Sequence, residues 1–341
     1  MSTALDDQLA PTLDFGDARA EFRALVSGCG VYGVKGRARI GLTGSDRVRW
    51  LNGMVTNNIR DLARGRGVYA FMLNPQGRIL ADFYVFNRGD RLLIDTDQSQ
   101  AEKILATFDH YIIMDEVEVS NLSLESATIG VGGPNSRKVL RAAGLELAEL
   151  APLEFADSAW QQMSLTALRT DHEAIELFEL WLAPAHAPAL QAALLKAGAK
   201  PVGAAALESF RIASGIPRYG QDIRERDLPQ ETEQRRALNF SKGCYVGQEI
   251  VERIRSRGNV HRTFTGFVVE GVLPPLGTKI QLDGKDVGEI TSVASLPVAT
   301  GERLVALGYV RREAASAGKE LSAEGAKLTV TGVPFAEVFT N

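Results

Sequence analysis

Cys244 is the residue whose surroundings best suit chemistry. It lies in the segment KGCYVGQE at residues 242–249. The pattern after Gly247 predicts a helix that ends at Gly258, which would place the cysteine just before a helix N-terminus and two residues after Lys242. Both neighbours favour a thiolate over a thiol, so Cys244 is a candidate reactive group. The alternative stays open that this lone cysteine is a small buried apolar residue and that the glycines only shape a turn.

The composition bounds the class of protein. The chain has 341 residues, a hydrophobic content of 45%, a charged content of 23% and a formal net charge of −4. Such a length and composition are typical of a soluble globular protein with two or three domains. The acidic balance argues against a general nucleic-acid surface, so we expect no direct nucleic-acid partner. A basic strip is interpreted as a solvated helix face and comprises Arg253, Arg255, Arg257 and Arg262.

Cysteine usage and hydropathy predict a location. Two cysteines, Cys29 and Cys244, are too few for a disulfide framework and fit a reducing compartment. No apolar run approaches the roughly 18 residues that a membrane span needs, so we expect no membrane association. Residues 1–17 contain four aspartates and no basic residue, which does not fit an ordinary signal or transit peptide. The expected location is therefore the cytoplasm, and no spacing typical of a metal site is found.

The hydrophobic patterns predict an α+β fold with mixed or antiparallel sheets. Strands at 67–73 and 79–86 are joined by the turn sequence Asn-Pro-Gln-Gly, and an amphipathic helix follows at 98–111. Beyond Thr263, five short strands at close spacing suggest a small β-barrel. The expected domains are an N-terminal lead-in with a short helix at 1–30, a first α+β domain at 31–125, a second at 126–260 that carries the 242–249 motif and could interleave with the first, and a barrel at 261–341.

The 242–249 motif resembles the K-G-C-Y-x-G-Q-E signature of the YgfZ family, folate-binding proteins related to the glycine-cleavage T-protein. Residues 207–223 are similar to the T-protein segment L-R-x-E-x-G-x-P-x-Y-G-x-D, and residues 44–58 look like the region of that family near the pterin cleft. The resemblance implies a T-protein-like architecture, with two mixed α/β domains and a C-terminal β-barrel around a central cleft that takes tetrahydrofolate.

The resemblance also implies which residues bind folate. Arg211 falls in the segment that helps to hold folate in the family, and its guanidinium group would suit the carboxylates of a folate glutamate tail. A surface pair between Arg211 and Glu208 on one helix is the alternative. The folate-contacting glutamate of the family has only a loose match, at Glu173 or Glu176. The expected cofactor-binding set comprises Arg211, Glu173, Asn57, Tyr245 and Gln248.

The chain departs from the T-protein at a pair of aspartates, one of which is the catalytic residue of aminomethyl transfer in that family. Residues 74–82 align with this region, alanine occupies one of the two positions, and only Asp82 remains. The sequence does not decide whether Asp82 matches the catalytic aspartate.

The function that the resemblance implies is tetrahydrofolate-dependent assembly or repair of iron–sulfur clusters in client enzymes, including those that thiolate tRNA. Cys244 would carry redox chemistry or the transient binding of sulfur or iron. Lys242 and the helix N-terminus would hold its thiolate, and Asp82 would contact the pterin or one-carbon side. Two alternatives remain: a T-protein-like aminomethyltransferase, which leaves Cys244 unexplained, and a non-catalytic folate-binding scaffold. Whether the chain is an enzyme stays open.

Overall fold

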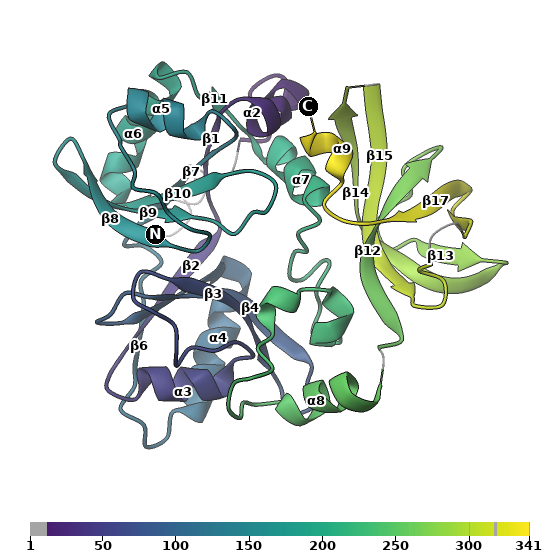
Figure 1. Cartoon of the computed structure of the whole chain (residues 1–341), viewed down its shortest axis with the longest axis horizontal. Helices are drawn as coiled ribbons and strands as arrows, with labels where there is room; N and C mark the ends of the chain where they lie inside the picture. The colour runs from purple at the N-terminus through teal and green to yellow at the C-terminus, as the bar shows by residue number, and fades with distance from the viewer. Residues whose placement is uncertain (1–11, 259, 300, 317–318, 341) are drawn as a thin grey trace, which may run out of the picture. The chain divides into compact units, whose positions relative to one another are not determined.

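The chain is described by a computed structural model that covers residues 12–258, 260–299, 301–316 and 319–340. It forms two compact units whose parts alternate along the sequence (Figure 1). The first unit consists of Met1–Arg37, Leu122–Phe210 and Glu337–Asn341, and the second of Ala38–Asn121 and Arg211–Ala336. Within the described residues, no helix is long and apolar enough to cross a membrane.

The first unit is built on a six-stranded sheet with the order β11-β1-β7-β10-β9-β8. β1 (Gly30–Gly33) pairs in parallel with β11 (Lys200–Pro201). The other strands are antiparallel and comprise β7 (Ala127–Gly132), β8 (Phe155–Trp160), β9 (Met163–Arg169) and β10 (Leu177–Leu182). The helical elements are α2 (Ala18–Ser27), α5 (Ser136–Ala142), η2 (Pro184–His186), α6 (Ala187–Lys196), most of α7 (Ala204–Ala213) and most of α9 (Ala336–Phe339). An apolar core joins α5 and α6 to this sheet and includes Val31, Val139, Leu190 and Leu194.

The second unit contains a five-stranded sheet with the order β3-β4-β5-β2-β6. Its strands are β2 (Arg37–Thr43), β3 (Gly67–Leu73), β4 (Ile79–Asn87), β5 (Leu92–Asp97) and β6 (Glu118–Asn121). Successive side chains of a strand point to opposite faces of the sheet. One face packs against α3 (Arg47–Met54) and α4 (Gln98–Tyr111), with Ala70, Ala81 and Phe83 in the shared core. The opposite face of the β3–β4 pair carries Tyr69 across from Tyr84 and Phe71 across from Asp82.

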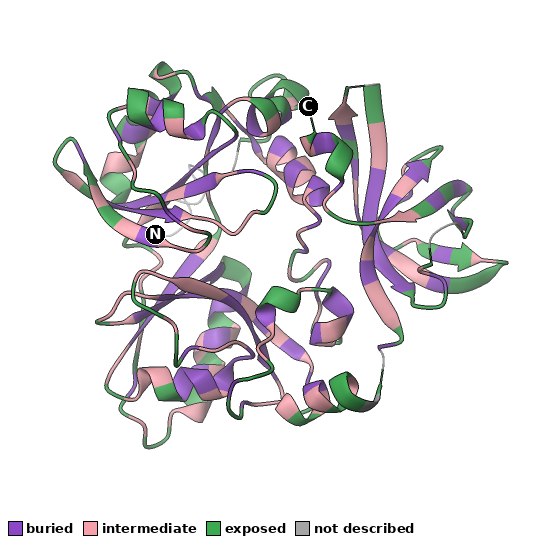
Figure 2. Cartoon of the chain, viewed as in Figure 1, coloured by how far each residue is buried: buried purple, intermediate pink, exposed green. Residues whose placement is uncertain are grey.

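A closed six-stranded barrel follows in the same unit, with the order β12-β15-β14-β13-β16-β17. The strands are β12 (Arg262–Glu270), β13 (Lys279–Leu282), β14 (Lys285–Val298), β15 (Gly301–Arg311), β16 (Leu321–Ala323) and β17 (Ala326–Thr331). The segment between α7 and the barrel contains η3 (Pro229–Thr232), η4 (Arg235–Ala237) and α8 (Gln248–Arg257). Figure 2 shows that buried residues are concentrated on the strands of the sheets and the barrel.

Local patterns agree with the structure better than long-range organisation does. The predicted hairpin is β3 and β4, and the helix predicted at 98–111 is α4. The barrel has six strands where five were expected, because β16 has only three residues and leaves almost no periodicity in the sequence. The two units divide between residues 37 and 38 and between residues 121 and 122, near the expected domain boundaries at 30 and 125, and again between residues 210 and 211, inside the expected second domain. The 242–249 motif was expected in the second α+β domain, but it belongs to the unit that contains β2–β6.

Candidate functional site

Lys242 fastens the motif turn to the end of α3. Its ammonium group donates hydrogen bonds to the backbone oxygens of Asn52 at 2.6 Å, Val55 at 2.6 Å and Asn57 at 2.7 Å. The last carbonyls of a helix lack hydrogen-bond donors within the helix, and a lysine ammonium has three protons to donate. Lys242 therefore supplies one donor to each of these three backbone oxygens. Burial, and to a smaller extent the positive charge of Arg60, lowers the pKa of Lys242 to about 7.

Two glycines let this turn approach the β3–β4 turn. Gly247 is the N-cap of α8 and has a φ of 81°, and a Cβ atom there would lie 2.6 Å from the backbone oxygen of Asn74. Gly77, in the β3–β4 turn, has a φ of 71°, and its Cβ would lie 2.8 Å from the Cβ of Ile250. Positive φ and close backbone approach both favour glycine. The shape of the motif therefore depends on the hairpin at residues 74–77.

Cys244 is exposed, three residues before Gly247, while its neighbours Lys242 and Tyr245 are buried. Lys242 was expected to stabilise a thiolate at Cys244. Instead, its ammonium group donates its three protons to backbone carbonyl oxygens. A different cation approaches the turn: Nη2 of Arg60 lies 3.7 Å from the position that a Cβ on Gly243 would take. Arg60 was not selected from the sequence, because nothing in its local pattern relates it to residue 243.

Asp82 is the centre of the second cluster of the candidate site, on the face of the β3–β4 pair opposite α3 and α4, where the side chains of Tyr69 and Phe71 are buried. Its carboxylate accepts hydrogen bonds from the Tyr69 hydroxyl at 2.5 Å and from the Gln100 amide at 2.7 Å. The Gln100 side-chain oxygen in turn accepts from the backbone N–H of Asp82 at 2.9 Å, and the Thr96 hydroxyl donates to the backbone oxygen of Asp82 at 2.9 Å. Asp82 is half-buried.

The neighbouring position 81 faces the other way. Ala81 is fully buried in the core between the sheet, α3 and α4, where a carboxylate would be a buried charge in an apolar environment. Of the two positions aligned with the aspartate pair, 82 is therefore the one on the face opposite α3 and α4, where Asp82 is half-buried. Burial and the nearby charge of Asp82 raise the pKa of Tyr69 well above its usual value, so the phenol stays protonated and donates a hydrogen bond to this carboxylate.

Asn57 positions the residues around Asp82. Its side-chain amide donates hydrogen bonds to the backbone oxygens of Tyr69 and Arg236, both at 2.8 Å. The Arg236 guanidinium lies 4.7 Å from the centre of the Tyr69 ring, a cation–π contact. Asn57 was expected to bind the cofactor, but its amide nitrogen is occupied by these backbone groups. Arg236 was missed, because 179 positions separate it from Asn57.

Arg211 lies in a buried ion-pair network instead of on an open surface. Its guanidinium donates to Asp222 at 2.7 Å and to the Ser292 hydroxyl of the barrel at 2.8 Å. Asp222 is fully buried and also accepts from the Arg218 backbone N–H at 2.9 Å. The sequence offered a surface ion pair between Arg211 and Glu208 as the alternative to folate binding. The structure instead shows a buried ion pair between Arg211 and Asp222. The contacts of Arg211 join the segment after α7 to β14.

The remaining expected residues do not contribute to the Asp82 cluster. Glu173 is exposed in the turn before β10, in the first unit, whereas Glu176 forms a bidentate pair with Arg137 at 2.8 Å. Tyr245 is buried beneath the motif turn, and its backbone N–H donates to the side-chain oxygen of Gln248 at 3.3 Å. Both motif residues thus support the turn. Among the described residues, no group of three or more His, Cys, Asp or Glu side chains is placed to hold a metal ion.

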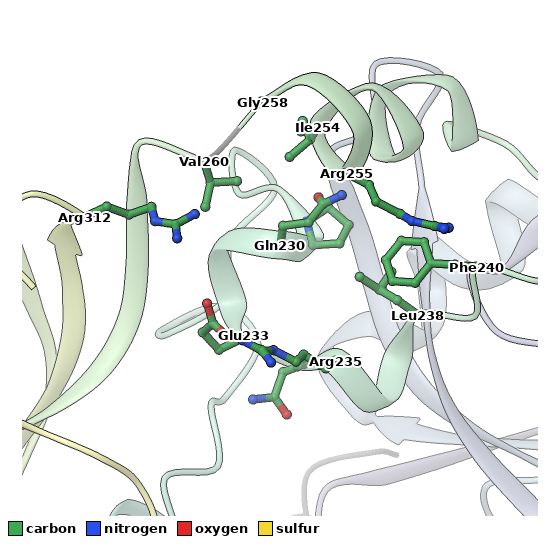
Figure 3. A pocket seen from close by; sticks show the side chains of 12 residues that line it. Gln230, Glu233, Arg235, Leu238, Phe240, Ile254, Arg255, Gly258, Val260 and Arg312 are labelled. Carbon is green, nitrogen blue, oxygen red and sulfur yellow. Dashed lines mark hydrogen bonds and ion pairs between the residues drawn. The ribbon is translucent and has the colours of Figure 1, made fainter.

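A pocket of about 310 Å³ flanks the C-terminal end of α8 (Figure 3). The Arg255 guanidinium lies 4.6 Å from the centre of the Phe240 ring on its wall, and Arg312 of the barrel reaches it from the opposite side. The carboxamide oxygen of Gln230 is buried there without a hydrogen-bond partner. None of the site residues expected from the sequence lines this pocket.

Comparisons with known proteins agree with this architecture. The GCVT N-terminal domain family matches residues 11–242, and the family described as the CAF17 C-terminal beta-barrel domain matches residues 260–336. The aminomethyltransferase of Rubrobacter xylanophilus is 28% identical over 305 residues, which cover 88% of this chain and 81% of that protein. The aminomethyltransferase of Geobacillus kaustophilus is 27% identical over 333 residues, which cover 94% and 90%.

The fold is also shared with a solved structure. The glycine cleavage system aminomethyltransferase T from Bartonella henselae superposes with a TM-score of 0.84 at 22% identity, covering 98% of this chain and 96% of that one. This likeness confirms the expected T-protein-like fold, with two α/β domains and a closed C-terminal barrel. Because the first family match spans well over half of its 341 residues, the chain belongs to the family of the GCVT N-terminal domain, and it carries a barrel of the CAF17 type.

Proposed function

We propose that this protein uses tetrahydrofolate while it assists the assembly or repair of iron–sulfur clusters in client enzymes, including enzymes that thiolate tRNA. The observation that carries the proposal is the exposure of Cys244 in a turn whose other side chains are anchored. Lys242 and Tyr245 are buried on either side of it, and Gly247 packs against the β3–β4 turn. A cysteine needed only for packing would be buried, as Cys29 is.

The proposed role of Cys244 is transient ligation of the cluster or of its iron. The thiol would release its proton to solvent on binding and ligate iron as a thiolate. An iron–sulfur cluster normally has four protein ligands, so one cysteine would supply one ligand and the client enzyme the others. Such a shared site suits delivery or repair better than permanent storage.

The residues around Asp82 suit the pterin end of a folate. A half-buried carboxylate accepts hydrogen bonds from N–H groups, and the half-buried ring of Tyr84 next to it offers an aromatic surface. Tyr69 and Gln100 hold the carboxylate in place, and Asn57 holds Tyr69. Tetrahydrofolate, when bound, would supply a carrier for one-carbon groups. Membership of the GCVT family supports this cofactor, and Asp82 with Tyr84 would hold it.

A second candidate function is aminomethyl transfer to tetrahydrofolate. The relatives named aminomethyltransferase favour it, and so does the half-buried position of Asp82, with Tyr69 as its hydrogen-bond donor. In this function Asp82 would carry the chemistry, and Cys244 would have no part. The two functions therefore predict opposite effects for substitutions at these two residues.

The test is complementation in cells that lack their own homologue, with the activity of an iron–sulfur tRNA-thiolating enzyme as the readout. We expect rescue by the parent chain and by the control variant Cys29→Ala, and loss of rescue with Cys244→Ser. Full rescue by Cys244→Ser would refute the role of the thiol. It would instead favour the alternative that the protein is a non-catalytic folate-binding scaffold. Absence of rescue by the parent, together with aminomethyl transfer that Asp82→Asn abolishes in the purified protein, would establish the second candidate.

A further inference from the structure

A second pocket lies entirely within the first unit and has a volume of about 450 Å³. Three parts of the chain form it: one side of α2 with the Gly28–Cys29 turn, one side of α5 with the preceding Asn135, and the turn from α6 into β11. This volume lies in the range of small-molecule sites in proteins. No residue expected from the sequence to bind folate or to carry chemistry lines it.

The charges around this pocket are all of one sign. Arg23 of α2, Lys138 of α5 and Lys200 of β11 line it, and its thirteen lining residues include no aspartate or glutamate. In the part of the chain that the structure describes, none of these three cations forms an ion pair. Their neighbours on α5 differ, since Arg137 and Arg141 both pair with glutamates. Such a cluster is unusual in a chain whose acidic residues outnumber its basic ones by 42 to 38.

Helix ends do not neutralise the cluster. The C-terminal ends of α2 and α6 face the pocket, and each carries a partial charge of roughly −0.5, so together they offset about one of the three positive charges. Burial raises the pKa of the Cys29 thiol to about 11, so this lining residue is neutral at physiological pH. A net local charge of roughly +2 remains for a ligand to balance.

A neutral hydrogen-bonding group completes the lining. Asn135 precedes α5 at the N-cap position, yet its side chain makes no capping hydrogen bond. Its exposed carboxamide is therefore available as a donor next to Lys138. Arginine, lysine and amide donors together are the set that recognises phosphate oxygens in proteins.

We propose that this pocket binds a small molecule that carries two or three linked phosphate groups. A compact anion with several charges matches three cations that line one pocket from three elements, whereas one phosphate carries at most about −2 and leaves most of the volume empty. A nucleic-acid strand would need a longer track of cations, and the net charge of −4 does not favour one. The inference is independent of the proposed function in cluster assembly.

The test is isothermal titration calorimetry of the full chain with sodium tripolyphosphate and, separately, with ATP. Each of the variants Arg23→Gln, Lys138→Gln and Lys200→Gln is expected to weaken binding of tripolyphosphate about tenfold, the lower end of the effect of one charge-assisted hydrogen bond. Lys196→Gln is the matched control, since this exposed lysine of α6 does not line the pocket, and binding should stay within about twofold. Binding should weaken further with added salt.

Three results would overturn the proposal. The first is the absence of heat with both probes at millimolar concentration. The second is an equal loss of binding in Lys196→Gln and Lys138→Gln, which would indicate a diffuse charge effect. The third is tighter binding of a 20-nucleotide single strand than of tripolyphosphate, unaffected by the three lining variants. Because all three cations are exposed, the variants should fold normally, and circular dichroism checks this.

Discussion

Gly247→Ala should destabilise the protein, whereas Gly243→Ala, four positions earlier in the same motif, should not. At position 247 the φ of 81° costs an alanine about 1–2 kcal/mol, because its Cβ meets the following carbonyl in the left-handed region. The new Cβ would also lie 2.6 Å from the Asn74 backbone oxygen, and relieving such overpacking costs about 1–3 kcal/mol. The expected loss is therefore about 2–5 kcal/mol.

Gly243 is the matched control. Its φ is outside the left-handed region, and the atom nearest to a Cβ added at this position would be Nη2 of Arg60 at 3.7 Å, an ordinary contact. Alanine there should change stability by no more than about 0.5 kcal/mol, and it could stabilise by restricting the unfolded chain. Both variants replace a glycine of the same turn with the same residue, so only local geometry separates them.

Thermal unfolding and amide exchange would measure the difference. With an unfolding entropy of about 2.1 cal/mol/K per residue, 2–5 kcal/mol corresponds to a fall in Tm of about 3–7 °C for cooperative unfolding of 341 residues. The Val246 amide, which donates to the Gly53 oxygen at 3.1 Å, should exchange faster in Gly247→Ala and at the parent rate in Gly243→Ala. Equal effects of the two variants, or a loss below about 0.5 kcal/mol for Gly247→Ala, would refute the packing argument.

Three further outcomes are expected. Tyr69→Phe removes the hydroxyl that donates to Asp82 and should lower the free energy of unfolding by about 1–2 kcal/mol in urea titrations; an unchanged midpoint would contradict the bond. In the folded protein a thiol reagent should modify Cys244 but not Cys29 until unfolding, and equal rates would refute the difference in burial. Partial burial opposes ionisation, but hydrogen bonds from Lys279 and Arg224 lower the pKa of Glu289 to about 2. Its contribution to stability should therefore be present above about pH 4.5 and be lost as the pH falls toward 2, and Glu289→Gln should show a smaller acid dependence.

Elements with strong local signals could be predicted from the sequence. The hairpin at 67–86 has two alternating runs around a strong turn sequence, and the helix at 98–111 has a regular apolar face, so neither needs distant contacts to be recognised. The barrel was recognised as a class, but its smallest strand, β16, is held by pairing with β13 and β17 and not by a pattern of its own. Boundaries between the units depend on pairings such as β1 with β11, which are 170 positions apart.

Several contacts within the candidate site also join residues that are far apart in the sequence. Lys242 bonds to Asn52 across 190 positions, and no local feature distinguishes a lysine that caps a helix from one beside a thiol. Tyr69 and Gln100 are closer to Asp82 in sequence, at 13 and 18 positions. Strand alternation could have identified Tyr69, because the turn at 74–77 sets the register in which Phe71 opposes Asp82.

The structure separates the motif into residues that build the turn and one that does not. Lys242 binds three carbonyls, Tyr245 fills a core, Gln248 accepts from a backbone N–H, and Gly247 admits the β3–β4 turn. The backbone of Val246 bonds to α3, and Glu249 pairs with Arg253 on the surface of α8. Cys244 alone has a reactive side chain that is exposed, and no hydrogen bond involves it among the described residues. A motif that folds this way without help from its cysteine gives no structural reason for a thiol at position 244. The proposed ligation of iron by Cys244 would supply that reason.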